Sequence, residues 1–276
     1  MKANTYTFIL WLLLITAPAL AQDTIQVPLL HYSHSIPTGS ATAISLDRAG
    51  NVYLLDKNMN VLRLDALGRP IDTFSPPARG RFNSIHAWNP MKIVLFYEGS
   101  QQLVLLDRFL RPISTTDLLN LDYYNTAKLV APANDQGYWL FDETNATLSK
   151  LNPSMREIAV ETPLNLLLNQ EQFDARQLRE YQNLVYLLDY NSGIFVFDNL
   201  GNYKTKLPHT GLHYMGFRGN ELYFVKENKL YFQDLYSQAT RVLELSADKE
   251  YISALVGEDH QLYLFSRNSM DIYFTK

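Results

Sequence analysis

Two carboxylates mark the most regular stretch of the sequence, GNVYLLDKNMNVLRLDALGRP, at residues 50–70. Asp56 and Asp65 each follow an apolar run, and carboxylates in such positions are candidate metal ligands or acid–base catalysts. The competing interpretation is local, because an aspartate at a strand end accepts hydrogen bonds from backbone N–H groups of the following turn. Whether the stretch is unique or repeated decides between the two interpretations.

The aspartates recur at equivalent positions later in the chain, but unevenly. Positions equivalent to Asp56 hold Asp142 and Asp189 in two later stretches and other residue types elsewhere, so a closed ring of carboxylates is not expected. The column that contains Asp65 is more uniform, and each member begins a turn. We therefore predict that both columns stabilise turns, and we predict no metal and no other cofactor. The uniform column comprises Asp65, Asp107, Asn152, Asp198 and Asp234.

No contiguous catalytic motif is present. The sequence contains neither a G-x-S-x-G nucleophile motif nor an H-E-x-x-H zinc motif nor a glycine-rich phosphate loop. His31 and His34 are three residues apart, but a metal site would need at least one further ligand from elsewhere in the chain. His213 opens a predicted innermost strand, which makes it a possible residue of a central channel. Spacing alone therefore identifies no catalytic residue.

The elements that position these residues are short strands in six repeats. Apolar runs begin 41, 45, 47, 37 and 40 residues apart. Each run is accompanied by one earlier and two later runs, separated by polar turns, so each repeat contains four short strands. Four strands in a repeat of about 40–45 residues predict a β-propeller. The apolar runs are at residues 52–55, 93–96, 138–141, 185–188, 222–225 and 262–265.

The ends of the chain predict how the ring closes. The sixth repeat stops at Lys276, after its third strand, and the spare segment DTIQVPL at residues 23–29 precedes the first repeat. Pairing of the two ends would remove two exposed sheet edges. We therefore predict an all-β fold, a six-bladed propeller of four-stranded blades over residues 22–276, with the last blade closed by the N-terminal strand. Residues 22–40 would hold the closing strand and the loop that leads into the first blade.

The first repeat combines an opening turn, an apolar run that ends in aspartate, and a second run followed by a tight turn. Its marker residues are Gly50, Asn51, Asp56, Asn60, Arg63 and the turn at residues 65–68. This pattern resembles the NHL-type repeat of six-bladed propellers, closely in the first repeat and in LVYLLDYNSGIFVFDNLGN of the fourth. The resemblance implies the propeller fold. It implies no single function, because NHL-like propellers include binding modules, receptor parts and enzymes.

The N-terminal residues have the features of a secretory signal peptide. Lys2 precedes the apolar stretch FILWLLLIT, and Ala19-Leu20-Ala21 is a small-x-small cleavage site. We expect cleavage after Ala21 and a periplasmic or secreted bacterial protein. No later segment has about 18 uninterrupted apolar residues, so no transmembrane segment is expected in the mature chain. The chain has no cysteine and therefore no disulfide. Its formal net charge is −4, which argues against nucleic acid as a partner.

Loop lengths indicate which face of the propeller binds a partner. The turns between first and second strands are short, whereas the long connections, at residues 30–42, 75–83, 116–126 and 161–175, share the opposite face. Binding groups concentrate on long loops, and aromatic residues with interspersed arginine suit protein or glycan surfaces. The candidates on this face are His31, Tyr32, His34, Arg79, Arg81, Phe82, Asp122, Tyr123, Tyr124, Glu171, Phe173, Asp174 and Arg176.

These observations favour a monomeric, non-enzymatic binding or scaffold protein whose loop-rich face meets a protein or glycan of the cell envelope. The alternative is a channel-mouth enzyme, such as a metal-assisted hydrolase, a lactonase or a lyase. That alternative requires several histidine, acidic or asparagine side chains to converge at the propeller axis. Isolated residues drawn from several blades leave no motif in the sequence, so the alternative stays open at this point.

Overall fold

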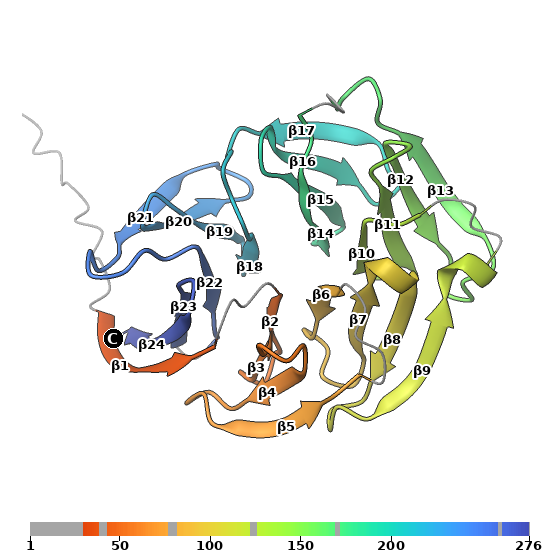
Figure 1. Cartoon of the computed structure of the whole chain (residues 1–276). Coiled ribbons are helices and arrows are strands. Elements are labelled where there is room, and N and C mark those ends of the chain that lie inside the picture. The colour runs from red at the N-terminus through yellow and green to blue at the C-terminus, as the bar shows by residue number, and fades with distance from the viewer. Residues whose placement is uncertain are drawn as a thin grey trace, which may run out of the picture.

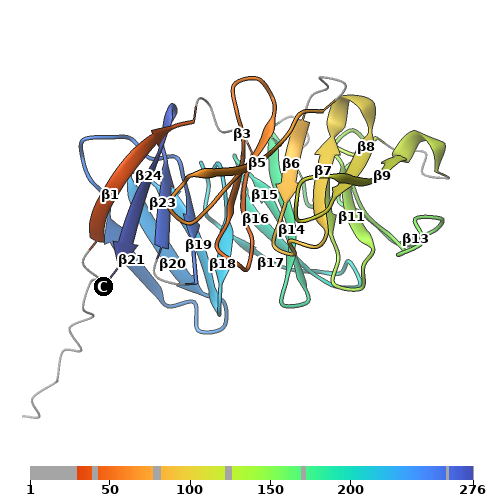
Figure 2. The same ribbon diagram turned by 90° about the horizontal axis from the view of Figure 1, so that it is seen from below.

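The computed structural model describes residues 30–38, 43–76, 82–121, 126–168, 172–258 and 261–275. These residues form six four-stranded antiparallel sheets, arranged as blades around a central axis (Figure 1). Viewed from below, the blades stand side by side in a flat ring (Figure 2). The six-bladed propeller predicted from the repeats is thereby confirmed. No helix in the described parts is long and apolar enough to cross a membrane.

Each blade follows the same order from the axis outwards. The innermost strands are β2 (Ile44–Leu46), β6 (Phe82–His86), β10 (Leu129–Pro132), β14 (Ala175–Tyr181), β18 (Gly216–Arg218) and β22 (Ser253–Val256). The second strands are β3 (Val52–Leu55), β7 (Ile93–Tyr97), β11 (Tyr138–Asp142), β15 (Leu184–Asp189), β19 (Glu221–Lys226) and β23 (Gln261–Phe265). The third strands are β4 (Val61–Leu64), β8 (Gln102–Leu106), β12 (Thr147–Leu151), β16 (Gly193–Asp198), β20 (Lys229–Asp234) and β24 (Ser269–Thr275). The outermost strands are β5 (Pro70–Phe74), β9 (Pro112–Asp117), β13 (Ile158–Pro163), β17 (Tyr203–Leu207), β21 (Thr240–Glu244) and β1 (Leu30–Pro37).

The second strands form the centre of the core. All six apolar runs predicted from the sequence lie within them, and side chains such as Tyr53 on β3 and Trp139 on β11 are completely buried. Each hydrophobic cluster joins residues of two neighbouring blades, so both faces of a second strand are covered. A strand buried on both faces has no polar side to present, which explains why these runs do not alternate with polar residues.

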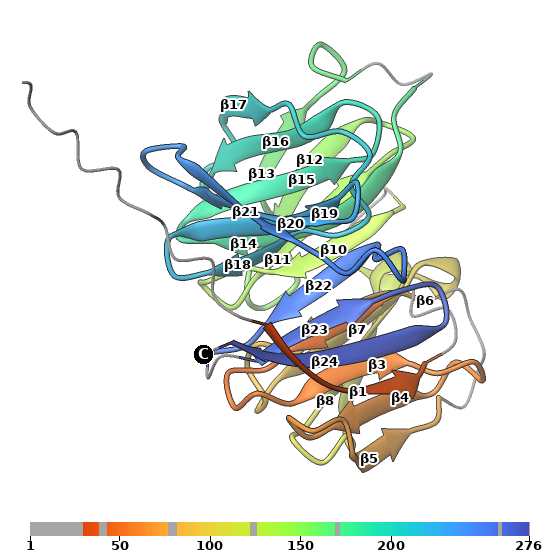
Figure 3. The ribbon, with the colours of Figure 1, turned by 90° about the vertical axis from the view of Figure 1, so that its left-hand side faces the viewer.

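The sixth blade is closed by β1, which pairs with β24 from Leu30 opposite Thr275 to Pro37 opposite Ser269. Figure 3 shows the two strands side by side. The closing strand was expected at residues 23–29, which lie outside the described residues, and residues 30–42 were expected to form a loop. That loop prediction is wrong for β1. Outer strands face solvent, so the polar stretch HYSHS was mistaken for a loop.

The aspartates of the repeats stabilise turns, as the local interpretation predicted. Asp65 Oδ1 accepts the N–H groups of Leu67 and Arg69 at 2.9 and 2.8 Å. Asp56 Oδ1 accepts those of Asn58 and Asn60 at 2.7 and 2.8 Å. An aspartate that accepts the N–H groups two and four residues later closes a tight turn between strands. The carboxylates of Asp56 and Asp65 are therefore occupied by their own turns.

Candidate functional site

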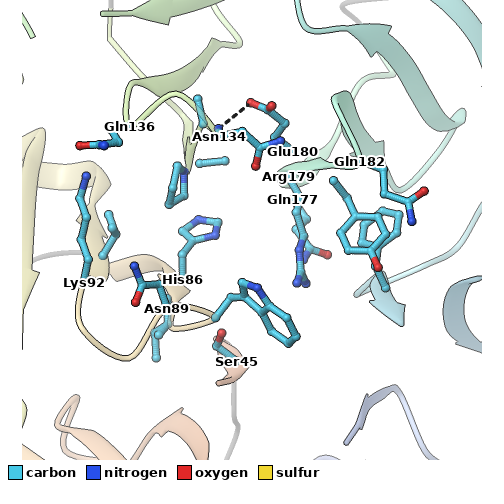
Figure 4. A pocket seen from close by; sticks show the side chains of 18 of the residues that line it. Ser45, His86, Asn89, Lys92, Asn134, Gln136, Gln177, Arg179, Glu180 and Gln182 are labelled. Carbon is cyan, nitrogen blue, oxygen red and sulfur yellow. Dashed lines mark hydrogen bonds between the residues drawn. The ribbon is translucent and has the colours of Figure 1, made fainter. Parts of the chain in front are cut away.

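A cavity of about 430 Å³ opens at one end of the propeller's central channel. Its walls come from the innermost strands β2, β6, β10, β14 and β18, together with the turns that follow β6, β10 and β14. We call this cavity the channel-mouth pocket; Figure 4 shows its side chains converging from several blades. The pocket lies at the end with the short turns between first and second strands. Loop length indicated the opposite end.

Tyr181 and Phe217 form an aromatic wall of the channel-mouth pocket, and Trp88 lines the pocket from another blade. Tyr181 stacks on Phe217 with ring centroids 4.6 Å apart and an interplanar angle of 19°. The Tyr181 hydroxyl donates to the carbonyl oxygen of Gly219 at 2.7 Å, which fixes the orientation of its ring. Trp88, on the turn after β6, is 48% exposed although it is a large apolar side chain. Flat apolar surfaces of this kind are typical of ligand-binding pockets.

Amide side chains form the polar part of the rim. They come from three separate turns and from β14, so they surround the opening rather than cluster on one blade. Gln182 is held in place because its Nε2 donates to Gly219 O at 3.0 Å and its Oε1 accepts from the hydroxyl of Tyr236 at 2.9 Å. Amides both donate and accept hydrogen bonds. The amide residues of the pocket are Asn89, Asn134, Gln136, Gln177 and Gln182.

His86 lies in the channel beneath this opening, at the end of β6 (Figure 4). Its Nε2 is 2.7 Å from the carbonyl oxygen of Val130 on β10. A carbonyl only accepts, so Nε2 carries the proton and Nδ1 is left as an acceptor. Burial, helped by the positive charge of Arg179, lowers the pKa of His86 to about 4. The imidazole is therefore neutral at physiological pH.

A smaller cavity of about 60 Å³ lies towards the other end of the channel and shares His86, Gln177 and Tyr214 with the channel-mouth pocket. Arg176 and His213, both candidates from the sequence, line it. His213 therefore lies beside the channel, where its place before an innermost strand had suggested. The pKa of His213 is lowered, first by burial and then by the charge of Arg176.

Arg176 connects a small polar cluster at this second opening. Its guanidinium contacts the Asp174 carboxylate at 2.5 Å and lies 5.2 Å from the centroid of the Tyr190 ring. The Tyr190 ring is in turn 5.2 Å from that of His213. The structure thus brings three sequence-selected residues together, Asp174, Arg176 and His213. Asp174 and Arg176 already form an ion pair, which leaves little uncompensated charge for a ligand.

The other candidates that the structure describes do not surround either opening. His31, Tyr32 and His34 belong to β1, the outer strand of the sixth blade, where His34 Nε2 bonds to Leu67 O at 3.0 Å. Phe82 is buried against Tyr97, and Phe173 packs between Phe141 and Phe195. These two phenylalanines contribute to the core between blades. Six candidates, Arg79, Arg81, Asp122, Tyr123, Tyr124 and Glu171, lie outside the described residues.

Sequence reasoning missed most residues of the channel-mouth pocket. His86, Arg179 and Tyr181 sit on innermost strands, whose sequences are short and irregular beside the second strands. One usable signal was present, because ARQLREY at Ala175–Tyr181 carries several charges just before the apolar run of the fourth repeat. Within the described residues, no group of three or more histidine, cysteine or acidic side chains is placed to hold a metal ion.

Comparisons with known proteins identify the fold but no family. No protein-family model matches the chain, and no curated protein matches it in sequence. Solved propeller structures do resemble it. A streptogramin B lyase superimposes with a TM-score of 0.64 and 13% sequence identity, covering 90% of this chain and 98% of the lyase. A virginiamycin B lyase from Staphylococcus aureus gives a TM-score of 0.61 and 9% identity, covering 89% of this chain and 99% of the other.

A third similar structure is PorZ, a bacterial surface component of the type IX secretion system of Porphyromonas gingivalis. It has a TM-score of 0.55 and 14% identity, and the match covers 86% of this chain but only 32% of PorZ. At such identities the similarity extends to the fold and not to the activity. The comparisons therefore agree with the sheet topology: this chain is a six-bladed β-propeller.

Proposed function

We propose that this protein is a periplasmic or secreted binding protein that holds one or two sugar units of a glycan in its channel-mouth pocket. The observation that carries the proposal is the pocket's composition. Its volume of about 430 Å³ falls within the roughly 300–1,000 Å³ of small-molecule sites. Aromatic rings offer flat faces for the C–H groups of a sugar, and the surrounding amides offer partners for its hydroxyl groups.

A glycan fits this pocket better than the surface of a protein partner would. Protein partners usually bury broad areas around an anchor residue, whereas the polar groups here converge inside a small opening. The loop-rich face selected from the sequence stays a second proposed surface for a protein partner. Its support is the cluster of Asp174, Arg176 and Tyr190 at the other end of the channel.

The proposed location outside the cytoplasm rests on the signal-peptide pattern before Ala21. The similarity to PorZ, a surface component, agrees with it. We also propose that the chain is an NHL-repeat-like propeller, because its first and fourth repeats carry that pattern, and that it acts as a monomer. In a closed ring each blade packs between two others, so no blade face is left for a second copy to cover.

The alternative function is catalysis at the channel mouth, and His86 is the observation that favours it. A neutral imidazole beside a ligand pocket is placed to accept a proton. However, a general base is most effective when its pKa lies near the working pH, and the pKa of His86 is lowered to about 4. So weak a base supports hydrogen bonding to a ligand better than it supports proton abstraction. Binding is therefore the preferred function.

A glycan array probed with the mature protein tests the proposal, followed by calorimetric titration with the oligosaccharides that bind. Trp88→Ala should weaken binding about tenfold, because it removes an aromatic surface worth about 1 kcal/mol or more. Phe109→Ala is the matched control, since Phe109 is 45% exposed but lies outside the pocket lining. Absence of binding to any glycan, or equal losses in the two variants, would contradict the proposal.

A further inference from the structure

The channel-mouth pocket contains an imbalance of charge. Its lining includes two cationic side chains, Lys92 and Arg179, and one carboxylate, Glu180. This excess of positive charge occurs in a chain whose formal net charge is −4. A cavity with charge opposite to that of the whole chain concentrates ligands of the complementary sign, which here are anions.

Glu180 does not neutralise the pocket, because its carboxylate is already engaged. Its Oε2 accepts the indole N–H of Trp139 at 2.6 Å and the backbone N–H of Asn134 at 3.3 Å. The second of these bonds is the dashed line in Figure 4. Both donors belong to the third blade, so the carboxylate is directed at the neighbouring blade and fastens β14 to it. The negative charge of Glu180 is stabilised by these two N–H donors, so it does not neutralise the cations of the pocket.

Arg179 has no such compensation. Within the described ranges, no carboxylate lies within ion-pair distance of its guanidinium. The guanidinium lies 5.5 Å from the centroid of the Phe217 ring and interacts with the buried hydroxyl of Tyr214. Lys92 is similar: its ammonium lies 4.9 Å from the centroid of the Tyr138 ring, and no described carboxylate pairs with it. Aromatic rings orient both cations but leave their charges available.

His86 can bind a hydroxyl group of the ligand without changing the pocket's preference for an anion. Because the imidazole is neutral, it adds no third charge, and its Nδ1 has no partner among the described residues. An unpaired acceptor in a pocket suits an O–H donor of the ligand. The pocket thus combines two cations, one neutral acceptor, several amides and flat aromatic rings.

We propose that the channel-mouth pocket is specific for an acidic sugar, whose carboxylate or sulfate ester pairs with Arg179 and Lys92. This inference rests on the proposed function, since it names the class of glycan bound. The planar guanidinium fork matches the oxygens of a carboxylate or sulfate, and burial of that pair strengthens it relative to solvent. The sugar ring would lie against the aromatic wall, and a hydroxyl would donate to His86 Nδ1.

The test compares oligosaccharides that differ only in charge. Titration calorimetry would use a trigalacturonate, its methyl ester, and a sulfated galactose trisaccharide with its unsulfated parent, repeated with glucuronate and mannuronate oligomers. At least one acidic member should bind ten or more times more tightly than its neutral partner, and the difference should shrink as sodium chloride is raised from 50 to 500 mM. The carboxylate and sulfate arms identify which anion is preferred.

Three variants test which residues cause the preference for acidic oligosaccharides. Arg179→Met and Lys92→Met remove the charge but keep an unbranched side chain, and each should bring the ratio of acidic to neutral affinity most of the way towards one. Arg111→Met is the control, because Arg111 is an exposed arginine outside the pocket, paired with Asp107 at 2.9 Å. Thermal unfolding of each variant checks that it is folded.

The outcomes separate this inference from the proposed function. Equal affinity for acidic and neutral glycans, or an acidic preference unchanged in Arg179→Met and Lys92→Met, would overturn the charge inference and leave glycan binding standing. If neither kind of glycan binds to the unmodified protein, the proposed function fails and the inference fails with it.

Discussion

Ser35 and Asp271 join the two ends of the chain: the Ser35 Oγ donates to Oδ1 of Asp271 at 2.5 Å, across 236 positions of sequence. Asp271 is almost completely buried and also accepts from Lys249 Nζ at 2.7 Å and from the Tyr251 hydroxyl at 2.6 Å. Burial by itself would raise the pKa of Asp271, but the hydrogen bonds from Lys249, Ser35 and Tyr251 outweigh it and lower the pKa. One carboxylate therefore connects β1, β24 and the segment before β22, and it secures the closure of the ring.

Asp271→Ala should destabilise the protein by about 3 kcal/mol, because it leaves a lysine and two hydroxyl groups without their shared acceptor. Urea unfolding at pH 7 measures the loss. The control is Glu244→Ala, which removes an exposed partner of Lys229 held at 2.7 Å and should cost less than about 1 kcal/mol. Similar losses in the two variants would show that the buried carboxylate does not fasten the sixth blade.

Gly68→Ala should also weaken the closure, for a different reason. Gly68 has a φ of +72°, and a Cβ there would lie only 2.0 Å from Cδ1 of Ile36 on β1. Gly50→Ala is the matched control, since its φ is +84° but no atom lies within 4 Å of the added Cβ. We expect about 1 kcal/mol from the backbone conformation in both variants and a further loss only in Gly68→Ala.

The excess loss in Gly68→Ala should shrink when Ile36→Val removes the clashing methyl group. Thermal unfolding of the single and double variants measures this coupling. Additive effects of Gly68→Ala and Ile36→Val would mean that the turn after β4 does not press on the closing strand.

His86 should make folding stability depend on pH between about 6.5 and 4. Its pKa is lowered from 6.5 to about 4 in the folded protein, so over this range the unfolded chain binds a proton that the folded chain does not. Stability therefore falls as the pH is lowered, by about 2 kcal/mol between pH 7.5 and pH 5. Above about pH 7.5 both states of His86 are neutral, and the residue no longer makes stability depend on pH.

Urea unfolding at pH 7.5 and pH 5, for the unmodified protein and His86→Gln, isolates this contribution. The variant should lose less stability on acidification than the unmodified protein does. His213, whose pKa is also lowered, is present in both proteins and cancels from the comparison. An identical pH dependence in the two proteins would show that His86 is not held neutral in the channel.

The fold was predictable because propeller blades impose a strong pattern on the sequence. A second strand such as β11, covered on both faces, must be continuously apolar, and a turn aspartate such as Asp65 recurs wherever the same turn recurs. The closing strand was predicted at residues 23–29, before its observed place at Leu30–Pro37, because β1 faces solvent on its outer edge. Its residues His31 to His34 therefore carry no apolar period that distinguishes a strand from a loop.

The channel-mouth pocket was less predictable because it depends on which side chains meet across blades. Arg179 and Lys92 are 87 positions apart in sequence and belong to different blades. No spacing rule relates such residues. Loop length pointed to the other end of the channel, whereas short turns carry Trp88 and Gln182 to the rim of this pocket. Arg176 was selected because it follows a long connection, and His213 because it precedes a predicted innermost strand.

On the proposed function, a ligand enters the propeller at the end with the short turns. Hydroxyl-radical footprinting, with and without a bound acidic oligosaccharide, distinguishes the two ends of the channel because it reports on both in one measurement. We predict that oxidation of Trp88 and Tyr181 falls severalfold on binding, while that of Tyr190 and His213 is unchanged. Protection of Tyr190 and His213 with no change at Trp88 would contradict the claim and place the ligand on the opposite face.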